Sequence, residues 1–158
     1  MTKTITLAPV RRSVRVNVSP ARAFEVFTTD IARWWPASHT LLKAPYKATI
    51  IEPHIGGRWY QVATDGSQCD NGKVRVWEPP SRLVLVWQID PQWQYDPDLD
   101  TEVEVNFTAD DEGTLVALEH RYIERMGTGA PAAHTAVGAP NGWSAILEEY
   151  RKQAEEGA

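Results

Sequence analysis

The 158-residue sequence predicts an α+β domain in which a curved antiparallel sheet of about six or seven strands wraps around a long C-terminal helix. Two patterns lead to this expectation. Apolar and polar residues alternate along most of the chain, as in strands with one buried face. Near the end, Trp143, Ile146, Leu147 and Tyr150 recur at the spacing of one helix face. An apolar sheet face and an apolar helix stripe bury each other, so we expect the helix to lie across the sheet.

The N-terminal part predicts one strand followed by two short helices. Val14, Val16 and Val18 fall on the same side of an extended segment. Ser19 suits the N-cap of a helix, and Pro20 suits its first turn. The predicted elements are a strand over residues 11–18, a helix over 20–29, a second helix over 31–35 that Asp30 caps and Pro36 ends, and a loop over 37–46.

The middle of the chain predicts strands joined by tight turns. Asp65 followed by Gly66 is a strong hairpin signal. The predicted strands cover residues 47–52, 58–64, 72–78, 82–89, 102–109 and 114–123, with a long loop over 91–100. Residues 127–142 contain four glycines and two prolines, so we expect a flexible connection there, with a short helical piece at 133–137.

Composition excludes several classes of protein. The 16 basic and 21 acidic residues give a net charge of −5, which argues against a general nucleic-acid binder. No apolar run approaches the roughly 20 residues of a membrane span. Cys69 is the single cysteine, so no intrachain disulfide is expected, and no Cys/His group has zinc spacing. We expect one cytoplasmic domain with its core at about residues 9–155, without metal or cofactor, as a monomer or homodimer.

Several short motifs occur in an order typical of a known superfamily. They are VNVSPARAFEVF at residues 16–27, EP at 52–53, GGRW at 56–59, GKV at 72–74, EPPSRL at 78–83, GT at 113–114 with Leu118 and His120, and GW at 142–143 with Leu147. The sequence thereby resembles the helix-grip (START-related, SRPBCC) superfamily. Within it, the chain is similar to the family named for the activator of the ninety-kilodalton heat-shock protein's ATPase. One departure is His54-Ile55, which stands between Pro53 and the paired glycines.

A curved sheet around one helix commonly leaves a cavity that accepts a small apolar ligand. The alternation places six apolar side chains on its wall, and their alternative role is core packing. Trp34 and Trp35 belong to the expected entrance, where they either gate the cavity or plug the end of the sheet. The predicted ligand-binding residues are Trp34, Trp35, Trp59, Leu85, Trp87, Val105, Phe107, Leu118, His120, Trp143 and Leu147.

His120 is the candidate for catalysis, because its imidazole is expected to point under the helix and can act as an acid or base near pH 7. The alternative is a core histidine bonded to a backbone group or a tryptophan. Trp93 and Tyr95, in the long loop, either recognise a partner or fold over the sheet edge. Asp96, Asp98 and Asp100 alternate as in a calcium loop, but Thr101 stands where that loop needs glycine and Phe107 where it needs glutamate, so we expect a solvated acidic loop. Acids near Cys69 raise its expected pKa, which argues against a redox role.

These features give three hypotheses for function. The first is a protein that binds a small hydrophobic or aromatic molecule between the sheet and the helix. The second, implied by the resemblance, is a co-chaperone that stimulates a heat-shock ATPase. The third is a cyclase- or hydrolase-like enzyme that uses His120. We expect no nucleic-acid or membrane partner.

Overall fold

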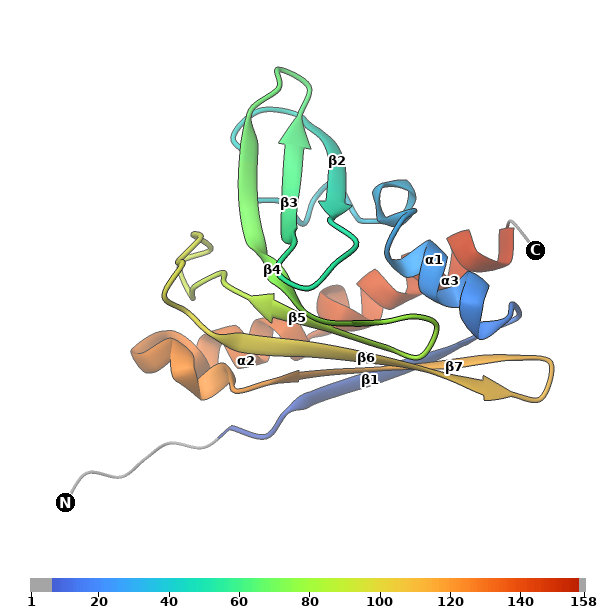
Figure 1. Ribbon diagram of the computed structural model, residues 1–158. Coiled ribbons are helices and arrows are strands. Elements are labelled where there is room, and N and C mark those ends of the chain that lie inside the picture. The colour runs from blue at the N-terminus through green and yellow to red at the C-terminus, as the bar shows by residue number, and fades with distance from the viewer. Residues whose placement is uncertain (1–6, 157–158) are drawn as a thin grey trace.

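The structure, a computed structural model, describes residues 7–156 and contains one seven-stranded antiparallel sheet (Figure 1). Its strand order is β1-β7-β6-β5-β4-β3-β2. The sheet curls strongly, so that β2 and β3 stand away from β6, β7 and β1 (Figure 1). The predicted α+β helix-grip architecture is confirmed. The strands are β1 (Val10–Val16), β2 (Tyr46–Ile51), β3 (Arg58–Ala63), β4 (Gln68–Glu78), β5 (Arg82–Trp87), β6 (Thr101–Asp110) and β7 (Gly113–Arg121).

Two short helical segments follow the first strand, as the sequence predicts. In α1 (Pro20–Phe27) the Ser19 hydroxyl accepts a hydrogen bond from the Arg22 backbone N–H at 3.2 Å, so Ser19 is the N-cap. The second segment is a single 3₁₀ turn, η1 (Ile31–Arg33). Asp30 does not cap it through its side chain, contrary to expectation. Its carboxylate pairs instead with the Arg22 guanidinium at 3.1 Å.

The short helical piece expected at residues 133–137 is confirmed within a longer helix, but the flexible connection expected over the rest of residues 127–142 is wrong. The segment forms η2 (Ile123–Gly129), α2 (Ala130–Gly138) and the wide turn η3 (Pro140–Ser144). Pro131 lies in the first turn of α2, where its missing N–H costs nothing, and the following alanines favour a helix. Gly142 leaves the helical conformation, and a Cβ there would lie 2.3 Å from the Val137 carbonyl oxygen. The close approach that Gly142 permits brings Trp143 back onto the core.

The C-terminal helix, α3 (Ala145–Glu156), packs against α1 and β1 on the concave side of the sheet. Ile146, Leu147 and Tyr150 are buried on its inner face, as their spacing predicts. The Tyr150 hydroxyl donates a hydrogen bond to the Ala23 carbonyl at 2.8 Å, and this bond ties α3 to α1. None of the helices in residues 7–156 has both the length and the hydropathy of a membrane span.

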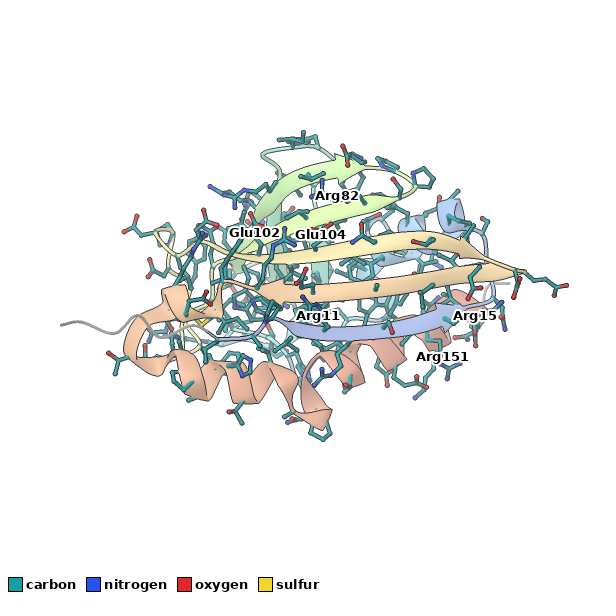
Figure 2. The ribbon with its side chains drawn as sticks, turned by 90° about the horizontal axis from the view of Figure 1, so that it is seen from below. Arg11, Arg15, Arg82, Glu102, Glu104 and Arg151 are labelled. Carbon is teal, nitrogen blue, oxygen red and sulfur yellow. The ribbon has the colours of Figure 1, made fainter. Side chains whose placement is uncertain are left out.

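Rows of opposite charges cross the outer face of the sheet. Arg121 on β7 contacts Glu102 at 2.7 Å, Glu104 at 2.6 Å and Glu119 at 3.2 Å. Arg82 on β5 approaches Glu104 at 2.8 Å, and Figure 2 shows these two residues and Glu102 together on neighbouring strands. The hydrogen bond from Arg82 is the main cause that lowers the pKa of Glu104 to about 2. The outer face is therefore held by ion pairs and the inner face by apolar packing.

Candidate functional site

The concave side of the sheet contains a cavity of about 340 Å³ near the junction of α2 and α3. Its size lies at the lower end of the range typical of small-molecule sites, about 300–1,000 Å³. Aromatic and aliphatic side chains form most of its wall. The lining residues are Trp35, Ser38, His39, Thr40, Leu41, Asn71, Trp87, Ile89, Trp93, Ala136, Val137, Asn141, Gly142, Trp143 and Ile146.

Four tryptophans from separate segments form a closed ring of aromatic contacts beside this cavity. Trp35 contacts Trp59 with ring centroids 6.0 Å apart, and Trp59 contacts Trp87 at 5.8 Å. Trp87 contacts Trp143 at 5.6 Å, and Trp143 returns to Trp35 at 6.4 Å. Most of these contacts are edge-to-face, the geometry that the ring quadrupoles favour. Three members line the cavity, whereas Trp59 lies fully buried in the core.

A hydrogen-bonded chain in the core fixes the orientation of the Trp143 indole and ties it to the backbone of Trp87. Trp143 donates its Nε1–H to Nδ1 of His120 at 3.1 Å. Nε2 of His120 therefore carries the proton and donates it to the Thr101 hydroxyl at 3.2 Å. Thr101 in turn donates to the Trp87 carbonyl at 2.9 Å. Burial lowers the pKa of His120 to about 3, so its imidazole is neutral near pH 7.

The loop between η1 and β2 supplies three polar residues of the cavity wall, Ser38, His39 and Thr40. The His39 carbonyl accepts hydrogen bonds from Trp35 Nε1 at 2.8 Å and from Gln61 Nε2 at 3.2 Å. The His39 side chain contacts the Asn141 carbonyl through Nε2 at 2.8 Å. A carbonyl can only accept, so neutral His39 carries its proton on Nε2. These bonds hold the loop against β3 and against the connection between α2 and α3.

The loop after β5 contributes Trp93 to the cavity wall. Trp93 is half exposed and has a left-handed backbone conformation with φ of 60°. The Asp90 side chain holds this turn by accepting hydrogen bonds from the backbone N–H groups of Gln92 and Gln94. Trp93 therefore combines an exposed ring surface with a position on the cavity, whereas Tyr95 pairs with Ile89 in an isolated bridge and does not line it.

The residues that the sequence suggested for the site divide into two groups. Trp35, Trp87 and Trp143 line the cavity. The others are buried side chains that do not line it: Trp34, Trp59, Leu85, Val105, Phe107, Leu118, His120 and Leu147. Because both ring nitrogens of His120 are engaged within the core, the imidazole has a positioning role toward Trp143 in this arrangement.

The sequence predicted none of the polar residues of the wall, which are Ser38, His39, Thr40, Asn71 and Asn141. His39 and Asn141 lie in segments without periodic patterning.

Two other residues that the sequence analysis considered lie outside the cavity wall. Burial raises the pKa of the Cys69 thiol, and the charge of Asp70 adds to the shift, in the direction that the sequence suggests. Asp100, in the acidic loop, forms an ion pair with Arg75 at 2.8 Å.

The helix-grip sheet, the buried face of α3 and the motif order point to one family. A family model described as "Activator of Hsp90 ATPase homolog 1-like protein" matches residues 17–153. The chain belongs to this family. A search of curated proteins found no match.

Two solved structures are similar in sequence as well as in fold. An anthrahydroquino-γ-pyrone synthase, Txn09, is 39% identical, with a TM-score of 0.64 over 93% of this chain and 97% of that one. The self-sacrificing resistance protein CalC from Micromonospora echinospora is 31% identical, with a TM-score of 0.71 over 95% and 96%. The Aha1 dimer from Colwellia psychrerythraea is 17% identical, with a TM-score of 0.64 over 96% and 98%, and this likeness concerns the fold alone.

Proposed function

We propose that this family member binds a small, planar, hydrophobic molecule in the cavity beside the tryptophan ring. The observation that carries the proposal is the convergence of Trp35, Trp87 and Trp143 on one cavity of about 340 Å³. Flat indole faces and edges bind aromatic ligands well, because they bury a large area with little loss of side-chain entropy. The 39% identity to a synthase named for a polycyclic aromatic product supports an aromatic ligand.

The proposal is tested with the hydrophobic dye 8-anilinonaphthalene-1-sulfonate and two matched variants on one helix. Ala136 lines the cavity, whereas Ala132 is exposed on α2 and does not. Ala136→Trp fills the cavity and is expected to weaken binding of the dye at least tenfold. Ala132→Trp is expected to bind it as the parent does. Equal binding by both variants, or no saturable binding by the parent protein, would overturn the proposal.

The identity to a synthase also favours a second candidate, an enzyme that acts on a ligand in the same cavity. His39 is the titratable side chain among the residues that line the cavity. Its Nδ1 contacts the hydroxyl of Ser38 at 3.0 Å on the cavity wall, where a ligand group can replace that hydroxyl, whereas both partners of His120 lie in the core. We therefore assign proton transfer to or from the ligand to His39 rather than to His120. His39→Gln is expected to abolish turnover of an anthrahydroquinone and to leave its binding intact. Turnover that survives this replacement would remove His39 from the reaction. The co-chaperone alternative is supported by the family's description alone.

A further inference from the structure

An irregularity in the sheet turns one polar side chain onto the cavity wall. Strands β3 and β4 pair Trp59 with Gly72 and then Tyr60 with Asp70, so Asn71 is an extra residue in β4. Such a bulge changes the direction in which a side chain points, and bulges are frequent beside functional sites. The Asn71 carbonyl accepts a hydrogen bond from the Gln88 N–H at 2.9 Å. Asn71 is only 2% exposed, and it is one of the residues that line the cavity.

The Asn71 side-chain oxygen is an exception among the buried amides near the site. Oδ1 of Asn71 has no hydrogen-bond partner. By contrast, Gln61 bonds the His39 carbonyl at 3.2 Å, and Gln88 bonds the Pro97 carbonyl at 3.0 Å. The other buried side-chain atoms without a partner among residues 7–156 belong to Trp59 and Glu124, neither of which lines the cavity. A buried acceptor that is left unpaired is costly, so its place on a cavity wall suggests a partner group on a ligand.

The chemistry around Asn71 restricts what this partner group is. A carboxamide oxygen accepts, so the ligand must supply an O–H or N–H donor. No carboxylate lines the cavity, so an ammonium donor would lose its hydration without a counter-charge. The surrounding wall is mainly aromatic and aliphatic, with Trp87 and Trp143 as its largest members. A neutral hydroxyl on an aromatic ring satisfies all three conditions.

We infer that Asn71 selects hydroxylated aromatic ligands by accepting a hydrogen bond from a phenolic O–H. This inference rests on the proposed binding function and adds the ligand's chemical class to it. The phenolic hydroxyl would donate a hydrogen bond to Oδ1 of Asn71, and the aromatic ring of the ligand would contact the tryptophans. A ligand of the same shape without the donor leaves Oδ1 unpaired, and such mismatches are the main source of selectivity in polar sites.

The test compares 2-naphthol with its methyl ether, 2-methoxynaphthalene, by isothermal titration calorimetry. The ether is the more hydrophobic of the two, so burial alone favours it. The parent protein is expected to bind 2-naphthol about tenfold more tightly, the worth of one additional neutral hydrogen bond. Asn71→Leu, which is similar in shape but lacks the acceptor, is expected to lose this preference. Ser38→Ala, which removes a different polar group from the wall, is expected to retain it.

The outcomes separate this inference from the proposed function. Equal affinities, or a preference for the ether in the parent protein, would overturn the inference. A preference for 2-naphthol that persists in Asn71→Leu would also overturn it, and Asn71→Ala repeats the comparison if the leucine variant does not fold. If neither naphthalene binds although the dye does, the phenolic class is wrong. If the dye also fails to bind, the proposed function is wrong.

Discussion

The indole N–H of Trp143 donates to Nδ1 of His120 at 3.1 Å, and this bond links the cavity wall to the fully buried core. Trp143 directly follows the kink at Gly142. Its position therefore depends both on this kink and on His120 of the distant strand β7. The shape of the candidate site therefore depends on a residue that does not line it. Mutations at His120 are expected to act on stability first and on ligand binding through Trp143.

The pH dependence of stability tests the state of His120. Burial lowers its pKa to about 3, below the ordinary value of 6.5, so the unfolded chain binds a proton that the folded chain excludes. Stability is therefore expected to fall as pH drops from about 6.5 toward 3, by up to about 1.4 kcal/mol per pH unit from this group. Urea unfolding between pH 5 and 7 measures the slope.

The control for this slope is His120→Gln, which removes the titrating group. Its stability is expected to change less between pH 5 and 6.5 than that of the parent protein. The pKa of Glu104 is lowered to about 2, so the titration of Glu104 changes the stability only below pH 4.5, outside this interval. Parallel pH profiles for the parent protein and the variant would contradict a neutral buried His120.

Replacement of Arg121 tests the ion pairs on the outer face. Arg121→Met leaves Glu102, Glu104 and Glu119 without their shared partner, and we expect a loss of about 1–2 kcal/mol at pH 7. The hydrogen bond from Arg82 is the main cause of the lowered pKa of Glu104, and the one from Arg121 adds to it. The Arg121 contribution to stability is therefore present above pH 4.5 and disappears as the pH falls toward 2. The difference between parent and variant in denaturant unfolding should shrink accordingly.

A matched arginine provides the control for Arg121. Arg11 pairs with Glu119 at 3.1 Å, but its side chain is 72% exposed. Arg11→Met is therefore expected to change the free energy of unfolding by less than about 0.5 kcal/mol, as is usual for exposed pairs. Equal losses in the two variants would show that burial does not strengthen the Arg121 pairs.

Alanine substitutions at two glycines distinguish the cost of a steric clash from the cost of a strained backbone conformation. A Cβ at Gly72 would lie 1.7 Å from the Val86 carbonyl oxygen, so Gly72→Ala must push β4 and β5 apart. We expect a loss above about 3 kcal/mol or failure to fold. At Gly66, where φ is +88°, a Cβ meets no atom within 4 Å. Gly66→Ala should cost only about 1–2 kcal/mol in thermal unfolding, because it adds strain without a clash.

Trp93 tests the contribution of the exposed loop to binding. Because half of its side chain is exposed, Trp93→Ala is expected to leave the free energy of unfolding within about 0.5 kcal/mol of the parent value. It removes one wall of the cavity, so dissociation of the anilinonaphthalene dye in stopped-flow measurements should become several-fold faster. Ile55→Ala, which replaces an exposed apolar residue outside the cavity, should leave the rate unchanged.

The sheet could be predicted from the sequence because alternation reports which face of a strand is buried. The side chains of Val103 and Val105 are fully buried on the inner face of β6, and Glu102 and Glu104 form ion pairs on its outer face. The start of the first helix was also predicted correctly, since Ser19 acts as its N-cap. The buried stripe of α3 followed from its spacing in the same way.

The sequence predicted only residues 133–137 of the helix α2, and it did not predict the polar wall. In α2 the small side chains of Ala130 and Ala133 are buried, and the flanking glycines resemble those of a loop. The position of Asn71 depends on a register shift between β3 and β4, which alternation cannot show. This irregular pairing is a property of two strands together, so neither strand's sequence alone indicates that Asn71 lines the cavity.

The closed ring of Trp35, Trp59, Trp87 and Trp143 has a spectroscopic consequence. Indoles whose centroids lie 5.6–6.4 Å apart in fixed mutual tilts couple their electronic transitions. The folded protein should therefore show strong exciton bands in circular dichroism that an unfolded chain lacks. Because three of these rings face the cavity, a molecule that enters it would perturb those bands, and the protein carries its own label-free reporter of occupancy.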